Sequence, residues 1–161
     1  MNEADRNSVR LIYFVCGETE DNMTEYFKTD DEIRSLVESF EACTIHPAEF
    51  RHYQHLTVAL WYVWFLPYDE AVARMTTGIR RLAEAYGKTG YHETITLFWV
   101  RIVSEFAAER AGSLTATANR LIENYNDKDH IVKYYSPELL ASEKAKAEWV
   151  EPDLKGLPRS L

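Results

Sequence analysis

The 161-residue sequence has little cysteine, a minority of basic residues and no long hydrophobic segment. Its two cysteines, Cys16 and Cys43, form no C-x-x-C pair and are too few for a disulfide framework, so we expect a cytoplasmic protein. Lysine and arginine number 18 against 26 acidic residues, which gives a formal net charge of −8. Because proteins that grip phosphate backbones cluster their basic residues, the sequence disfavours nucleic acid as a partner.

Membrane and nucleotide-binding signals are also missing. The apolar run from Leu11 to Cys16 is too short for a signal peptide or a membrane span, so we expect no membrane association. The few glycines form neither a P-loop nor a G-x-G-x-x-G fingerprint, and no G-x-S-x-G nucleophile elbow occurs. Nucleotide-triphosphate enzymes, dinucleotide enzymes and serine hydrolases therefore lack their usual sequence support.

The sequence does contain helical periodicity. Apolar residues recur at spacings of three and four, and proline, glycine and short polar residues separate the periodic segments. The pattern predicts an all-α fold, a single-domain antiparallel helical bundle over residues 27–161, preceded by a leader at residues 1–26 that is a short strand or an extended segment. Helices are expected at about residues 29–43, 48–65, 68–86, 91–110, 114–125 and 137–147.

The most unusual stretch opens the second predicted helix. His52 and His55 lie three residues apart, so about 60° separates them around the helix axis and both rings can face one point. His52 also shares a helix face with Leu56 and Ala59, which predicts that it is buried. A titratable side chain on a buried face indicates a candidate functional site.

A second polar pair is expected to meet the first. Short connections favour antiparallel neighbours, so the second and fourth predicted helices begin at the same end of the bundle. This arrangement brings His92 and Glu93 to His52 and His55, and it places all five histidines at one pole. Imidazoles together with a carboxylate are typical ligands of zinc or non-haem iron. We therefore predict a transition-metal site, zinc or iron, whose ligands are His52, His55, His92 and Glu93.

Two residues are candidates for catalysis on a small molecule. Glu93 is either a fourth metal ligand or the base that acts on metal-bound water, and Tyr135 is expected to orient the substrate. Glu49-x-x-His52 matches the spacing of di-iron bundles, but a second E-x-x-H is missing, so a mononuclear site is favoured. Structural interpretations stay open, because buried histidines are commonly hydrogen-bonded and an acid in a first helical turn favours the helix dipole.

Two other functions also stay open. The helices at 48–65 and 68–86 resemble one helix-turn-helix unit of a solenoid, and those at 91–110 and 114–125 a second, so a non-enzymatic interaction module is a rival hypothesis. A metal-free enzyme that uses histidine and glutamate as acid and base is the third. Trp64, if exposed, suggests a homodimer surface.

Three sequence blocks resemble an uncharacterised bacterial family of small helical proteins. They are His52-x-x-His55-Leu56, the Y-H-E-T-I-T block from Tyr91 to Thr96 with Trp99, and Trp149-Val150-x-Pro152-Asp153-Leu154 followed by Leu157-Pro158. The resemblance covers residues 30–158, and the Y-H-E-T-x-T block is its most specific part. It implies an all-helical fold and supports the choice of site residues, but it implies no activity, substrate or ligand.

Overall fold

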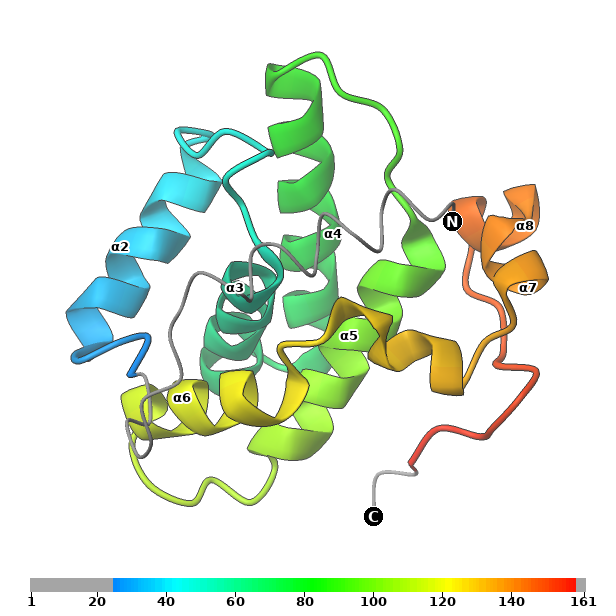
Figure 1. Ribbon diagram of the computed structural model, residues 1–161. Helices are drawn as coiled ribbons and strands as arrows, with labels where there is room; N and C mark the ends of the chain where they lie inside the picture. The colour runs from blue at the N-terminus through cyan, green and yellow to red at the C-terminus, as the bar shows by residue number, and fades with distance from the viewer. Residues whose placement is uncertain (1–24, 159–161) are drawn as a thin grey trace, which may run out of the picture.

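The computed structural model describes residues 25–158, and every regular element among them is a helix (Figure 1). The all-α fold predicted from the sequence is confirmed. The predicted leader lies outside the described residues apart from its last two positions. The five long helices are α2 (Asp30–Glu41), α3 (His52–Phe65), α4 (Tyr68–Ala85), α5 (Glu93–Ala107) and α6 (Leu114–Tyr125). The short ones are the 3-10 helix η1 (Lys128–Lys133), α7 (Pro137–Ala141) and α8 (Glu143–Ala147).

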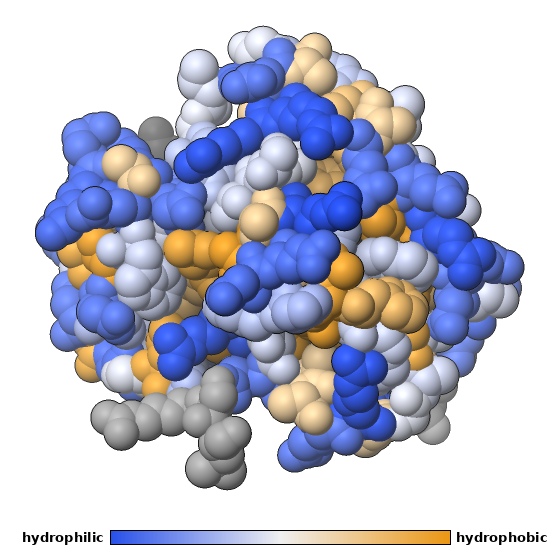
Figure 2. All heavy atoms as spheres, turned by 180° about the vertical axis from the view of Figure 1, so that it is seen from behind, coloured by the Kyte–Doolittle hydropathy of each residue, from blue (hydrophilic) through white to orange (hydrophobic). Residues whose placement is uncertain are grey.

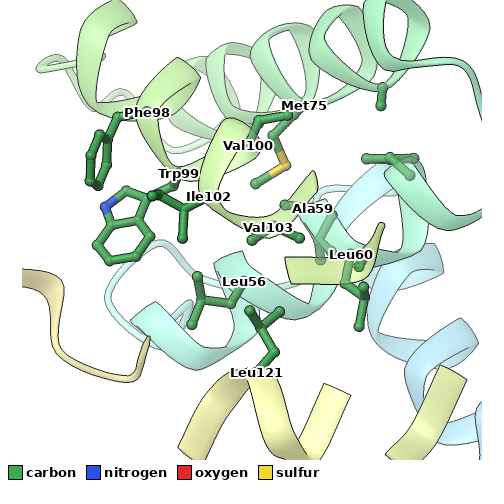
Figure 3. Close-up of a cluster of buried hydrophobic side chains, with 14 of the residues drawn as sticks. Leu56, Ala59, Leu60, Met75, Phe98, Trp99, Val100, Ile102, Val103 and Leu121 are labelled. Atoms are coloured by element: carbon green, nitrogen blue, oxygen red, sulfur yellow. The ribbon is translucent and has the colours of Figure 1, made fainter. Parts of the chain in front are cut away.

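Helix α3 lies at the centre of the molecule. The five consecutive residues from Leu56 to Leu60 are all buried, as expected for a helix that is covered on every side. Helices α2, α4, α5 and α6 all contact it and surround it in Figure 1. Figure 3 shows the side chain of Leu56 near Leu121 of α6, with Met75 and Val100 on the opposite side of α3. One enclosed helix differs from a solenoid, in which helix pairs stack in a row.

Two predicted helix boundaries were wrong. Helix α3 begins at His52 rather than near residue 48, because the segment after Pro47 forms a turn in which the Glu49 N–H donates to the His46 carbonyl at 2.8 Å. Glu49 therefore precedes the helix, and the Glu49-x-x-His52 spacing is not a helical turn. The last predicted helix is two short ones, because Ser142 has an extended backbone and caps α8 through its hydroxyl, which accepts from Ala145 N–H at 3.2 Å.

The surface alternates between charged and apolar side chains. Figure 2 shows apolar residues in patches among hydrophilic ones on the face seen from behind. Trp64 is half-buried, and the Arg110 guanidinium lies 4.7 Å from its ring centroid. Phe65 and Tyr68 are more exposed, at 58% and 42%. The homodimer stays a prediction. None of the helices in the described part of the chain is both long and apolar enough to cross a membrane.

Candidate functional site

A cavity of about 480 Å³ lies where α3 and α5 begin. His52, His55 and His92 all line it, so the structure brings three of the predicted residues together. The charged lining residues, Lys128 and Asp129 of η1, are exposed and lie at its rim. Most of the remaining wall is apolar, formed by Ala59, Met75, Ile79, Ile95, Trp99, Val100, Ile131, Val132 and Leu140.

His52 is a neutral hydrogen-bond acceptor at the cavity. Its Nε2 lies 3.0 Å from the carbonyl oxygen of Tyr125, and a carbonyl only accepts, so Nε2 carries the proton and Nδ1 carries a lone pair. Nδ1 has no hydrogen-bond partner among residues 25–158, where every buried side-chain nitrogen has one, so Nδ1 is exposed to solvent on a residue that lines the cavity. Burial lowers the pKa of His52 despite the carbonyl bond.

His55 is neutral for the same physical reason. Burial lowers its pKa to about 4, the neighbouring His52 lowers it further in the same direction, and a hydrogen bond with the Phe50 backbone opposes both. The His55 and Phe50 rings pack with their centroids 4.0 Å apart. At pH 7 the cavity therefore presents two uncharged imidazoles from one turn of α3.

His92 has a structural task that the sequence prediction missed. It is the N-cap of α5, where its Nδ1 accepts from the Ile95 N–H at 3.2 Å. Its Nε2 donates to the Leu140 carbonyl of α7 at 2.7 Å. Both ring nitrogens are thus occupied by backbone groups, and neither offers a lone pair to a metal ion in this arrangement.

The predicted catalytic residues, Glu93 and Tyr135, do not line the cavity. The Glu93 carboxylate accepts from the Tyr91 hydroxyl at 2.6 Å and from the Arg80 guanidinium at 3.1 Å. Tyr135 is fully buried, and its hydroxyl donates to the Val150 carbonyl at 2.7 Å. His52, His55, His92 and Glu93 therefore do not form one ligand set as they stand, and residues 25–158 contain no cluster of three or more His, Cys, Asp or Glu side chains placed to hold a metal.

Several residues around the cavity escaped the sequence interpretation. Arg80, an exposed residue of α4, lies 4.4 Å from the centroid of the Tyr91 ring and pairs with Glu93. Residues 126–136, over which no helix was predicted, contain η1, whose Ile131 and Val132 line the cavity. Two adjacent apolar residues in a polar stretch were the sequence signal that this segment packs on the body of the protein. The other two histidines do not line the cavity: the His46 ring contacts Tyr86 at 4.9 Å, and the His130 ring contacts Tyr125 at 5.2 Å.

The cavity offers the chemistry of a neutral binding site. It combines apolar walls with two uncharged imidazoles, and among the described residues the charged side chains that line it, Lys128 and Asp129, are exposed at the rim. Comparison with known proteins finds no family model that matches the chain, no similar curated protein and no similar solved structure. The function proposed below therefore follows from the geometry of the cavity.

Proposed function

We propose that the cavity binds an uncharged small molecule that has a mostly apolar body and one hydrogen-bond donor. Its volume of about 480 Å³ falls within the range of roughly 300 to 1,000 Å³ that is common for small-molecule sites. The observation that carries the proposal is Nδ1 of His52, an acceptor that has no partner among the described residues and belongs to a side chain of the largely apolar wall. An O–H or N–H group of a ligand would satisfy that acceptor.

The charge of the ligand follows from where the described residues place charged groups at the cavity. Both imidazoles of α3 are neutral, and Lys128 and Asp129 are exposed at the rim. A charged ligand group would lose its hydration on entry and would gain no opposite charge inside. An uncharged ligand avoids this penalty.

Binding has more support than acid–base catalysis. A general acid or base works best when its pKa lies near the operating pH, and burial holds the pKa of His55 at about 4. Glu93, the other candidate base, is occupied by Arg80 and Tyr91. The metal-free enzyme, the interaction module and the cytoplasmic location stay predictions from the sequence.

An NMR titration with three probes of one size tests the proposal. Uncharged β-naphthol is expected to shift the resonances of the Trp99 indole and the Thr96 methyl group and to saturate at one molecule per chain. The anion β-naphthoate and the cation β-naphthylmethylammonium should bind at least about tenfold more weakly, because each ion would lose its hydration without gaining an opposite charge. Equal binding of either ion, or no binding of β-naphthol, would contradict the proposal.

A cavity-filling substitution supplies the matched control. Ile79→Trp adds bulk to a half-buried position in the cavity wall and should abolish β-naphthol binding. Ile45→Trp makes the same change at a half-buried position that does not line the cavity, and binding should persist. Retained binding in Ile79→Trp would place the probe elsewhere on the molecule.

A transition metal, zinc or iron, is the second candidate ligand. The observation in its favour is that two neutral imidazoles, those of His52 and His55, line one cavity from one helical turn, and neutral imidazole is the form that binds metals. Metal analysis after purification without a polyhistidine tag tests it. Stoichiometric metal should be lost in His52→Phe and His55→Phe and kept in His92→Phe; wild-type protein that takes up no zinc or iron on titration would contradict it.

A further inference from the structure

The wall of the cavity also indicates what kind of body the ligand has. We infer that the ligand is a planar aromatic ring that carries the hydrogen-bond donor and packs against the rings of Trp99 and Tyr91. This inference rests on the proposed function, because it names the class of molecule that the same cavity binds. It follows from four aromatic rings that line one cavity, those of His52, His55, Tyr91 and Trp99.

The Trp99 ring is held in place by its aromatic neighbours. Its centroid lies 4.5 Å from that of His52 and 5.1 Å from that of Phe98, both in edge-to-face geometry. The Trp99 residue is only 9% exposed, and it belongs to the cavity wall. Figure 3 shows its indole beside Phe98 at the edge of the core, beyond Ile102. A ligand therefore meets an indole whose orientation is already fixed.

The Tyr91 ring is fixed from the outside of the cavity. Its hydroxyl donates to Glu93 at 2.6 Å, and the Arg80 guanidinium lies over the ring at 4.4 Å while it binds the same carboxylate at 3.1 Å. These three side chains hold one another, and Tyr91 alone among them lines the cavity. The polar groups that made Glu93 a catalytic candidate thus act as the support of an aromatic wall.

Fixed aromatic walls favour aromatic ligands. Rings that are already ordered lose little side-chain freedom when a ligand binds, and aromatic pairs gain from offset or edge-to-face contact beyond the area that they bury. A saturated ring of the same size would contact the aliphatic part of the wall equally well but would gain no ring-to-ring contact. The expected preference for the aromatic ligand is about tenfold, the upper part of the range for one or two aromatic pairs.

Three uncharged probes separate the ring from the donor. They are β-naphthol, which has both, decahydro-β-naphthol, which keeps the donor without aromatic character, and β-methoxynaphthalene, which keeps the ring without a donor. In NMR titrations of the full chain, β-naphthol should bind about tenfold more tightly than the saturated alcohol. Because the saturated alcohol is the more hydrophobic of the two, simple apolar burial predicts the opposite order.

Substitutions of Tyr91 should change the ratio of the affinities for β-naphthol and decahydro-β-naphthol. Tyr91→Leu should remove most of the preference for β-naphthol. Tyr91→Phe should keep it, because the ring remains and the Arg80 guanidinium, still bound to Glu93, still lies over it. Tyr86→Leu changes a half-buried tyrosine outside the cavity and should leave the preference unchanged. Tyr91→Phe keeps the test decisive if Tyr91→Leu does not fold, since a lost preference in a folded Tyr91→Phe variant would overturn the role of the ring.

The possible outcomes distinguish the inference from the proposal beneath it. If decahydro-β-naphthol binds as tightly as β-naphthol, the aromatic inference is overturned and the proposed function stands. If β-methoxynaphthalene binds as tightly as β-naphthol, the ligand needs no donor, and the proposed function is overturned in its requirement for a donor while the aromatic inference stands. If no probe binds, the proposed function itself fails.

Discussion

His55 is the residue whose environment departs most from that of a surface histidine. Burial lowers its pKa from 6.5 to about 4, and burial also lowers the pKa of His52. In the unfolded chain both histidines take up a proton near pH 6.5, which the folded chain resists. Their contribution to stability is therefore complete above pH 6.5 and is lost as the pH falls toward about 4.

The free energy of unfolding should consequently fall as the pH drops from 6.5 to about 4. One pH unit of pKa difference is worth about 1.4 kcal/mol, so the loss from His55 is on the order of 3 kcal/mol. Urea denaturation across this pH range measures it. His55→Phe keeps a ring against Phe50 and should flatten the curve, whereas His46→Phe, at an exposed histidine, should not. A wild-type stability that does not change over this range would contradict the burial argument.

His92 gives a second test at the residue scale. His92→Ala removes both the cap on the Ile95 amide and the bond to the Leu140 carbonyl, and the free energy of unfolding should drop by roughly 2 kcal/mol. His92→Asn restores a capping side chain but does not reach Leu140, so about half of that loss should return. Urea denaturation at pH 7 compares the two variants. Equal losses in both would contradict the capping role.

The sequence was informative about which residues meet and less so about what they bind. The common direction of α3 and α5 was enough to predict that His52, His55 and His92 approach one another. Their hydrogen-bond partners could not be predicted, because the carbonyls of Tyr125 and Leu140 come from segments whose docking depends on the whole fold.

At the scale of the element, α3 shows how a periodic pattern was interpreted too narrowly. The prediction placed one apolar stripe on this helix, yet no charged residue occurs between His55 and Asp69, so the sequence already indicated a helix buried all round. The starts of α2 and α7, expected near residues 29 and 137, were easier to predict. The hydroxyls of Thr29 and Ser136 cap α2 and α7, and a capping signal of this kind needs only a few neighbouring residues.

The packing of α4 on α2 yields a prediction of unusual sign. Gly78 lies inside α4, where glycine to alanine usually stabilises a helix by about 1 kcal/mol. A Cβ atom at Gly78 would lie 2.5 Å from Cζ of Phe40, whose side chain is fully buried. Gly78→Ala should therefore lower the free energy of unfolding by about 1 to 3 kcal/mol, because an overpacked core must shift.

Thr77→Ala is the matched control for this effect. Thr77 is the exposed neighbour of Gly78 on the same helix, and alanine has the higher helix propensity, so this variant should be unchanged or slightly more stable. Thermal and urea denaturation of both variants provide the comparison. A Gly78→Ala protein more stable than wild type would mean that α2 and α4 are less closely packed than the structure shows.

At the scale of the whole molecule, the cavity exists because short elements close one end of the bundle. Helices α3 and α5 begin side by side, while η1 and α7 contribute Ile131, Val132 and Leu140 to the wall. The sequence predicted the all-α class and the shared end. It did not predict the walls, since the helix expected over 137–147 is broken at Ser142 and no helix was expected where η1 forms.

The central claim is that Nδ1 of His52 is unprotonated and accepts a hydrogen bond from an uncharged ligand. The most direct measurement is the ¹⁵N chemical shifts of the His52 ring at pH 7, without and with β-naphthol. We expect the tautomer protonated at Nε2, and a shift of the Nδ1 resonance that saturates at one ligand per chain as the hydrogen bond forms. A proton on Nδ1 in the free protein would contradict the account, and so would an Nδ1 chemical shift that does not change when β-naphthol is added.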